Sequence, residues 1–369
     1  MGKFDSRVDS VFADIDVHSD PGAALLVIDH GEILCCRCYG LADLDTGRPI
    51  TTDTSFYLAS LSKQFTGMAI MLLAEQGKLD FNDRLHAYLP QLPAWGADIT
   101  IRHLLHHTSG LPHYIQFFSS SEQISEFTRD LTDVTNTAVL ERTTGLAAPE
   151  FPPGTQYAYS GVGYTLLALI VGIVSGQSFA DFLKAEVFDP LGMKHTVVYD
   201  ESRPFRHRLA HGYWKEQGQF ERCDYPMLTA GDGGLFSTLD DLFLWDQALN
   251  TERLVSKAML ERAFTSGATS GGTAVGYGFG WITNVFPYLS AAERKQLDLL
   301  GGADLRHVVH GGSWSTYYNY IIRLLDSQRT IIVLSNRGPI APASAPRGHM
   351  GFDGPRVRAH RVAEIVFGD

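Results

Sequence analysis

Cysteine is scarce in this sequence of 369 residues, which contains only four. Three of them, Cys35, Cys36 and Cys38, lie in one short apolar segment, and Cys223 stands alone. Because this spacing does not resemble a disulfide framework, it favours a reducing compartment. No second ligand pair with matching spacing accompanies the cluster, so we predict no metal site there and interpret the three cysteines as small buried residues of a strand.

Long apolar runs are also missing. The longest, near residues 164–174, is shorter than the roughly 20 residues that a membrane-spanning helix needs, so we expect a buried helix and no membrane insertion. The first 17 residues lack the apolar core of an export signal and instead carry apolar residues near helical spacing. We therefore expect a soluble, cytoplasmic protein, while removal of an upstream export signal stays open.

Basic residues are outnumbered, with 30 Lys and Arg against 41 Asp and Glu, which gives a formal net charge of -11. An acidic surface repels phosphate backbones and anionic lipid, so nucleic acid and membrane surfaces are poor partners. The hydrophobic share of 44% is that of an ordinary globular chain with a sizeable core. We expect a small-molecule partner, and the oligomeric state stays open.

The hydrophobic pattern predicts an α+β fold. Apolar runs at 22–29 and 33–40, separated by His30, Gly31 and Glu32, indicate a buried β-hairpin. Apolar residues at helical spacing predict helices over 100–106, 134–143, 161–175, 178–187, 238–248, 255–264 and 356–367. Further strands are predicted over 277–282, 305–310, 316–324 and 329–335.

This order of elements favours an antiparallel sheet, built from both ends of the chain, with flanking terminal helices. We predict that residues 1–60 and 265–369 form this sheet domain and that residues 61–264 form a large inserted, mostly helical domain. A cleft between two such parts is a natural ligand site, so we expect the active site there.

The segment at residues 60–63, Ser-Leu-Ser-Lys, is the first candidate for chemistry. Residues three apart on a helix share a face, so the Ser60 hydroxyl and the Lys63 amine can meet. A serine hydroxyl is a weak nucleophile that needs a neighbouring base, and a lysine can serve when burial or nearby cations favour its neutral form. Taken alone, so loose a pattern favours a helix cap followed by a surface lysine.

The surroundings of this segment are more specific. ASLSKQFTGMAI resembles the nucleophile helix of the serine β-lactamase and penicillin-binding protein superfamily, and is most similar to its branch of class C β-lactamase-like esterases and D-aminopeptidases. Five further segments resemble that branch in the same order: ITIRHLLHHTSGLP, FPPGTQYAYSGVGYTLLALI, DPLGMKHT, GGLFSTLDDL and VVHGGSWSTYY. The resemblance spans residues from about 55 to 320 and implies a serine hydrolase that uses no cofactor and no metal.

The resemblance also implies roles for single residues. Ser60 would be the acylated nucleophile, Lys63 would help to deprotonate it, and Tyr159 would relay the proton to the leaving group and later activate water. The backbone N–H groups of Ser60 and Ser313 would form the oxyanion hole. The implied substrate-binding positions are His310, Gly311, Gly312, Gly161 and Trp314.

One position departs from the family pattern. The asparagine that usually follows Tyr-Ser is Gly161 here, and the loss of its hydrogen bonds could weaken amide recognition by about 1–3 kcal/mol. We therefore expect a carboxylesterase. A β-lactamase or D-stereospecific peptidase (DD-peptidase type) and a non-catalytic binding or assembly protein stay open as alternatives.

Other candidates carry weaker patterns. Four histidines gather at His103, His106, His107 and His113, but no H-E-x-x-H pattern accompanies them, so we predict a structural role and no metal site. A G-x-S-x-G elbow is missing, which removes the main support for an α/β-hydrolase. Aromatic candidates for an acyl pocket are Phe117, Phe118, Tyr213, Trp214 and Trp314, and the loops 113–133, 201–226 and 265–275 would shape it.

Overall fold

The computed structural model describes residues 5–113, 115–118, 131, 133–199, 208–224, 226–283, 306–340 and 354–368. The helices in these ranges are α1 (Asp5–Ser10), α2 (Lys63–Glu75), α3 (Ile101–Leu105), α4 (Ile115–Phe118), α6 (Asn136–Thr144), α7 (Gly161–Ser175), α8 (Phe179–Leu183), α9 (Asp189–Leu191), α10 (Leu239–Ala248), α11 (Lys257–Ala263) and α13 (Gly354–Phe367). The main strands are β1 (Ala23–Asp29), β2 (Glu32–Tyr39), β10 (Ile282–Thr283), β11 (His307–Trp314), β12 (Tyr317–Leu324) and β13 (Arg329–Ser335).

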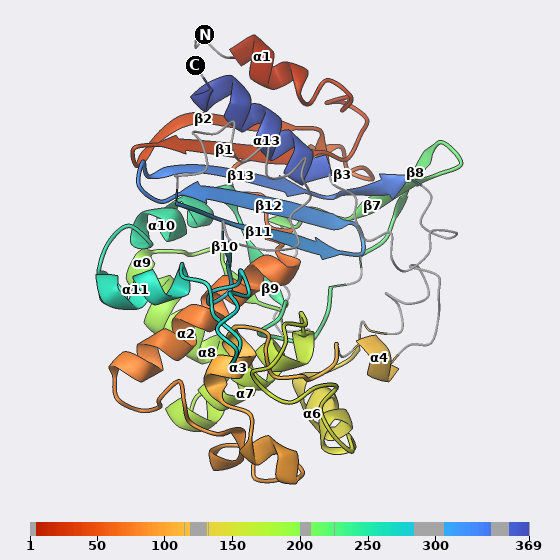
Figure 1. Cartoon of the computed structure of the whole chain (residues 1–369). Coiled ribbons are helices and arrows are strands. Elements are labelled where there is room, and N and C mark those ends of the chain that lie inside the picture. Colours follow the sequence, from red (N-terminus) through yellow and green to blue (C-terminus); the bar gives the residue numbers. More distant parts are fainter. Residues whose placement is uncertain are drawn as a thin grey trace.

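These six strands form one antiparallel sheet in the order β10-β11-β12-β13-β1-β2. The chain's N-terminal hairpin thus pairs with its C-terminal strands, and the part between them lies outside the sheet (Figure 1). This arrangement confirms the predicted α+β fold, in which an antiparallel sheet combines with a largely helical middle of the chain. The domain boundaries at residues 60 and 265 stay a prediction.

Strand β1 is buried on both faces, because its alternate side chains enter two different cores. Ala24, Leu26 and Ile28 belong to the core shared with the helical part, while Leu25 and Val27 belong to the core under the terminal helices. Figure 1 shows α1 and α13 on one side of the sheet and α2, α7 and α10 on the other. The nearly uninterrupted apolar run of β1 follows from this double burial.

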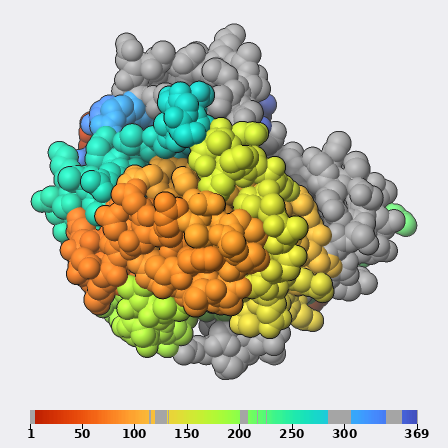
Figure 2. Space-filling model, turned by 60° about the horizontal axis from the view of Figure 1, so that its bottom comes forward, coloured from red at the N-terminus to blue at the C-terminus, as the bar shows by residue number. Residues whose placement is uncertain are grey.

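The helical part is organised around α2 and α7, which pack on each other. Helix α7 contains the longest apolar run of the chain, and ten of the eleven residues from Gly161 to Val171 are buried, all except Leu169. Its N-terminus is capped by Ser160, whose hydroxyl accepts a hydrogen bond from Gly163 N–H. Figure 2 shows the outer face of this part, where the orange segment that follows Ser60 borders the yellow region of α6. The predicted buried helix at 164–174 is therefore confirmed.

A second, small sheet joins the nucleophile region to the rest of the helical part. Strand β9 (Leu235–Ser237) pairs with β5 (Phe56–Tyr57) on one side and with β6 (Val197–Val198) on the other. The remaining short strands are β3 (Leu41–Asp43), β4 (Arg48–Pro49), β7 (Tyr213–Glu216), β8 (Gln219–Arg222) and β14 (Arg337–Ile340). Since β5 ends three residues before Ser60, its pairing with β9 fixes the backbone that leads into Ser60.

Three sequence expectations need correction. The strand predicted over 277–282 is reduced to Ile282–Thr283, because Gly276 and Gly280 adopt left-handed conformations that break the extended backbone. Cys35, Cys36 and Cys38 do lie on a strand, but it is the outermost strand β2 and they are only half-buried. The first turn of the predicted helix at Ser60 is a 3₁₀ turn, Ala59–Ser62, and α2 begins at Lys63.

Some expectations fall outside what the structure describes. Most of the predicted loop 113–133 and the segment 201–207 lie outside the described residues. Within those residues no single helix is long and apolar enough to cross a membrane; one pair, 161–175 with 179–191, meets the length and composition test only together and is bent by 78°.

One buried ion pair ties the helical part to the sheet. Arg323 of β12 donates from Nε to Asp246 Oδ1 of α10 at 2.8 Å, and Thr330 of β13 donates to the same oxygen at 2.6 Å. Both charged side chains are almost fully buried. We expect Asp246→Asn to lower the free energy of unfolding by about 3–5 kcal/mol, because it leaves a buried guanidinium without its counter-charge.

Urea denaturation of the variant measures this loss. Asp240→Ala, an exposed carboxylate on the same helix, is the matched control and should cost less than about 1 kcal/mol. Equal losses in the two variants would show that the ion pair does not stabilise the joint between helix and sheet.

Candidate active site

Ser60 lies in a tightly held 3₁₀ turn. The residue before it, Ala59, has a φ of +49°, a left-handed conformation that is rare for a residue with a Cβ. The turn is held against β9, because Leu58 N–H donates to Leu235 O at 2.8 Å and the Ser62 hydroxyl accepts from Leu235 N–H at 3.3 Å. Two hydrogen bonds to one residue thus hold the strained backbone that presents Ser60.

The amine of Lys63 lies beside the serine hydroxyl. Its Nζ donates to Ser60 Oγ at 3.1 Å and to the backbone oxygen of Asp232 at 2.6 Å, and the side chain is only 1% exposed. The ring centroids of Tyr159 and Tyr164 lie 4.9 and 5.6 Å from the same nitrogen. The structure therefore brings Ser60, Lys63 and Tyr159 together, as the sequence predicted.

Tyr159 directly precedes Ser160, the capping residue of α7, and its backbone is held on both sides. Ala158 N–H donates to His107 O at 2.9 Å, and Ser160 N–H donates to His107 Nδ1 at 3.1 Å. The Tyr159 ring lies 4.3 Å from the imidazole of His107, centroid to centroid. Two backbone hydrogen bonds, one on each side of Tyr159, thereby fix the position of its phenol.

Strand β11 packs directly on the nucleophile turn. A Cβ added to Gly312 would lie 2.1 Å from the backbone oxygen of Leu58, so only glycine allows this approach. A Cβ at Gly311 would meet nothing closer than Tyr320 Cδ2 at 3.5 Å, an ordinary contact. The glycine at 312 is therefore what lets β11 lie against the turn that contains Ser60.

The hydrogen-bond pattern of β11 leaves Ser313 facing this turn. Trp314 and Tyr317 flank a two-residue turn, so they form a hydrogen-bonded pair of the antiparallel ladder. The next residue of β11 then belongs to a pair without hydrogen bonds, and its backbone N–H and C=O groups point away from β12. This residue is Ser313. On that side β10 pairs only with Val308 and Val309, and no other described strand adjoins β11. The N–H of Ser313 is thus directed to an open edge beside Ser60.

His310 is buried and uncharged, and takes no part in this open edge. Its Nε2 accepts a hydrogen bond from the Tyr277 hydroxyl at 2.8 Å, and its Nδ1 lies 2.6 Å from Gly311 O. Burial, with the nearby positive charge of Lys63, lowers the pKa of His310 to about 3. A neutral imidazole with both nitrogens engaged in hydrogen bonds therefore stands in β11 two residues before Gly312.

A cavity of about 270 Å³ opens at these groups. It brings together Ser60, Tyr159, Ser313 and Trp314 from the predicted set, while Gly161, His310, Gly311 and Gly312 do not line it. The described aromatic candidates Phe117, Phe118, Tyr213 and Trp214 do not line it either. The cavity-lining residues are Tyr57, Ala59, Ser60, His113, Tyr159, Met227, Asp232, Gly233, Ser313 and Trp314.

Sequence reasoning missed several of these residues. The sequence predicted only a structural role for His113, but this residue lines the cavity and its ring lies 6.3 Å from that of Tyr159 at an interplanar angle of 21°. Burial and the positive charge of Lys63 lower the pKa of His113 to about 3, so it is neutral. Asp232, whose backbone oxygen holds Lys63, stands in the glycine-rich segment AGDGG. A lone charged residue among glycines was the available signal.

The histidines that gather in the sequence have different bonding partners in the structure. The Nδ1 of His103 accepts from Thr100 N–H as part of a helix cap, His106 bonds through Nδ1 to Tyr277 O, and His107 contacts tyrosine rings. Among the described residues no group of three or more His, Cys, Asp or Glu side chains could hold a metal ion.

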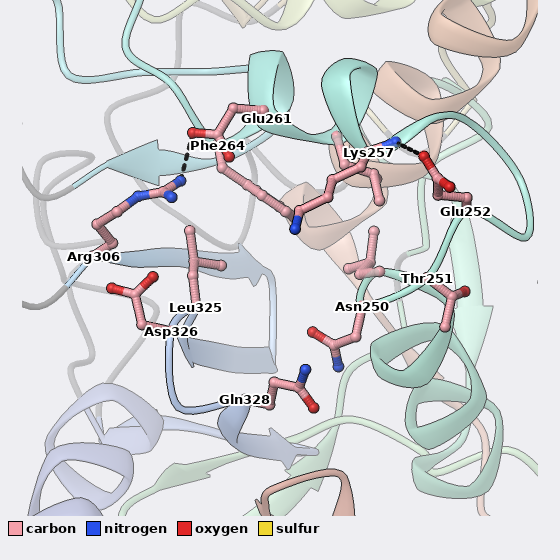
Figure 3. A pocket seen from close by; sticks show the side chains of 12 residues that line it. Asn250, Thr251, Glu252, Lys257, Glu261, Phe264, Arg306, Leu325, Asp326 and Gln328 are labelled. Carbon is pink, nitrogen blue, oxygen red and sulfur yellow. Dashed lines mark hydrogen bonds and ion pairs between the residues drawn. The ribbon is translucent and has the colours of Figure 1, made fainter.

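A second cavity, of about 360 Å³, lies away from the catalytic residues, between α11 and the turn that joins β12 to β13 (Figure 3). The Lys257 side chain points into it, and Arg306 pairs with Glu261 at 2.6 Å across its rim. Its wall combines both signs of charge with leucine side chains, and it contains none of the residues that the sequence singled out.

This site is that of a serine hydrolase of the β-lactamase and penicillin-binding protein class. It combines a buried lysine hydrogen-bonded to a serine hydroxyl, a tyrosine beside the same serine and an open strand edge. The chain belongs to the Beta-lactamase family, whose family model matches residues 8–349. Penicillin-binding protein 4* of Bacillus subtilis (strain 168) is 35% identical over 326 residues, which cover 85% of this chain and 67% of that protein.

Solved structures agree with this membership. The octameric penicillin-binding protein homologue from Pyrococcus abyssi is similar over 100% of this chain and 77% of that one, with a TM-score of 0.75 and 25% identity. EstCE1, a hydrolase with promiscuous acyltransferase activity, has a TM-score of 0.74 over 99% and 98% of the two chains, and its 22% identity shows the shared fold alone. The chain spans only 59% of another relative, Protein flp of Staphylococcus aureus (strain MW2).

The contact between β11 and the nucleophile turn predicts a sharp contrast between two adjacent glycines. Gly312→Ala must push β11 away from Leu58, so the Ser313 N–H leaves the open edge beside Ser60, where the family resemblance implies an oxyanion hole. We expect kcat for ester hydrolysis to fall by on the order of 10²-fold or more, the usual cost of losing one oxyanion donor.

Gly311→Ala is the matched control, since its added methyl group makes only an ordinary contact. Steady-state kinetics and melting temperatures of both variants check the prediction. Similar kcat values in the two variants would contradict the role assigned to this contact.

Proposed function

We propose that this protein is a carboxylesterase that forms an acyl-enzyme on Ser60. The observation that carries the proposal is the 3.1 Å hydrogen bond between Lys63 Nζ and Ser60 Oγ, in a cavity that Tyr159 and Ser313 also line. Membership of the Beta-lactamase family supports the broader assignment of this chain as a serine hydrolase.

The acylation step uses these groups in turn. This step requires the unprotonated form of Lys63: the free amine takes the hydroxyl proton while its hydrogen bond to Asp232 O keeps it in place, and Ser60 Oγ attacks the ester carbonyl carbon. The carbonyl oxygen becomes an oxyanion, which the N–H groups of Ser60 and Ser313 stabilise. The C–O bond to the alcohol then breaks, and the proton passes from Lys63 through Tyr159 to the departing alkoxide.

Deacylation repeats the sequence with water in place of the alcohol. Tyr159 accepts a proton from water while its own phenol proton passes to Lys63, the water oxygen attacks the acyl-Ser60 carbonyl carbon, and the second oxyanion occupies the same pair of N–H groups. Its collapse releases the carboxylic acid and returns the proton to Ser60 Oγ. All groups required are side chains and backbone amides of this chain.

Two features favour neutral esters over amides and anionic substrates. Position 161 lies in the first turn of α7 and, being glycine, supplies no side-chain amide to bind a substrate amide. His310 is neutral, buried and bonded at both nitrogens, so it gives no positive charge to a substrate carboxylate. The described cavity walls are otherwise largely apolar, with Tyr57, Met227 and Trp314.

An amide-directed activity is the second candidate, and the fold of a D-amino acid amidase from Ochrobactrum anthropi SV3 supports it (TM-score 0.75, 21% identity). That structure is similar over 99% of this chain but shares the fold alone. The lack of a side chain at position 161 speaks against it here.

A substrate panel tests the proposal. We expect hydrolysis of p-nitrophenyl acetate and p-nitrophenyl butyrate, with kcat/KM at least about tenfold higher than for the p-nitrophenyl monoester of succinate, which adds a carboxylate at similar length. A chromogenic cephalosporin and a D-amino-acid amide should be turned over more slowly still. Useful turnover of the cephalosporin or the amide alone would overturn the esterase assignment.

Replacement of the three catalytic candidates tests their roles. Ser60→Ala should abolish turnover and labelling by a fluorophosphonate probe, and Lys63→Ala and Tyr159→Phe should each lower kcat by on the order of 10²-fold or more. Melting temperatures control for folding. Wild-type protein that is folded but fails to label at Ser60 would favour the non-catalytic alternative, and near-normal activity of Tyr159→Phe would show that the proton relay is misassigned.

A further inference from the structure

His107 makes contacts that the proposed chemistry does not use. It is 1% exposed and lies in the left-handed region, with a φ of +57°. Its backbone oxygen accepts from Ala158 N–H and its Nδ1 accepts from Ser160 N–H, so one residue bonds to both neighbours of Tyr159. A buried polar side chain at a strained backbone position, bound on both sides of a catalytic candidate, points to a function beyond packing.

The protonation state of the ring follows from these bonds. Because Nδ1 accepts from a backbone N–H, the ring proton resides on Nε2. This Nε2 is buried without a hydrogen-bond partner among the described residues. The imidazole centroid lies 4.3 Å from that of Tyr159, 5.0 Å from that of Tyr164 and 4.5 Å from that of Tyr277. Aromatic faces, which attract an N–H group weakly, therefore surround the ring.

Charges around His107 keep it neutral. Burial lowers its pKa well below the ordinary histidine value, and the positive charge of Lys63 acts in the same direction. The other titratable groups that face it are His106, His113 and His310, and the tyrosines at 157, 159, 164 and 277. A neutral ring beside Tyr159 adds no second cation next to the lysine.

We propose that His107 is a positioning residue, which holds the phenol of Tyr159 at the distance from Ser60 and Lys63 that proton transfer requires. The two hydrogen bonds set the backbone of 158–160, and the imidazole supports the face of the Tyr159 ring. The inference rests on the proposed acyl-enzyme function and deepens it, because it names a residue that does not touch substrate as the one that positions the Tyr159 phenol for proton transfer.

Two replacements of equal size isolate the hydrogen bond. Asparagine tolerates the left-handed conformation, and its Oδ1 can accept from Ser160 N–H as Nδ1 does. Leucine has the same branched shape and suits an aromatic cage, but it accepts no hydrogen bond. We expect His107→Leu to lower kcat for ethyl butyrate by on the order of 10²-fold with KM changed less than about threefold, and His107→Asn to stay within about tenfold of wild type.

The rate of Ser60 labelling by a fluorophosphonate separates positioning from a general structural loss. Fluoride leaves without protonation, so labelling needs Ser60 and Lys63 but not the relay through Tyr159. We expect labelling of His107→Leu to stay within about threefold of wild type while ester turnover falls. His106→Asn, which replaces a neighbouring buried histidine bonded to Tyr277 O, is the control for lost stability and should retain turnover.

The outcomes distinguish failure of the positioning role of His107 from failure of the proposed esterase function. Equal loss of labelling and turnover in His107→Leu, or loss of neither, would overturn the positioning role while leaving the esterase intact. If the leucine variant does not fold, His107→Asn carries the test, because its loss of turnover with labelling unchanged would also overturn the role. A wild-type protein that neither labels nor hydrolyses esters would overturn the proposed function and this inference with it.

Discussion

The burial of one amine constrains most of the site. Lys63 is almost completely removed from water, which is costly for a charged group unless hydrogen bonds and polarisable neighbours replace the lost solvent. The backbone oxygen of Asp232, the hydroxyl of Ser60 and the rings of two tyrosines surround Nζ. Three histidines near it, at 107, 113 and 310, have lowered pKa values for which its positive charge is one cause. Burial and this neighbouring charge therefore keep the three histidines around Lys63 neutral.

The sheet and the helical part meet at this nitrogen, and glycines make the meeting possible. The backbone of β11 reaches the nucleophile turn only because position 312 has no side chain, and a Cβ at Gly280 would lie 2.6 Å from the backbone oxygen of Lys63. The ion pair of Arg323 and Asp246 holds the same two parts together on another side. The geometry of the site thus depends on contacts between segments far apart in the sequence, and a side chain added at position 280 or 312 would disturb them.

Local patterns predicted much of the fold and only part of the site. The β1–β2 hairpin and helix α7 were predictable because their apolar residues repeat at the periods of strand and helix. Ser60 and Lys63 were predictable because their spacing allows contact on a helix and because the segments around them resemble a known family. The strand at 277–282 was wrong because glycine backbone conformation overrode an apolar, aromatic composition. His113 and Asp232 were missed because their significance lies in tertiary contacts with Tyr159 and Lys63, which no spacing in the sequence encodes.

The proposed preference for esters follows from polar groups that the site lacks, more than from groups that it adds. A good leaving group needs less assistance than an amine, so an enzyme can act on esters with the oxyanion donors, the base and the relay alone. Amide substrates and substrates with a free carboxylate need further polar contacts, and neither the glycine at position 161 nor the neutral histidine at position 310, whose two nitrogens are already hydrogen-bonded, supplies them. If the missing contacts are what separates the two activities, accuracy in placing Tyr159 becomes the main determinant of rate, and His107 is the residue in the described structure whose bonds determine that placement.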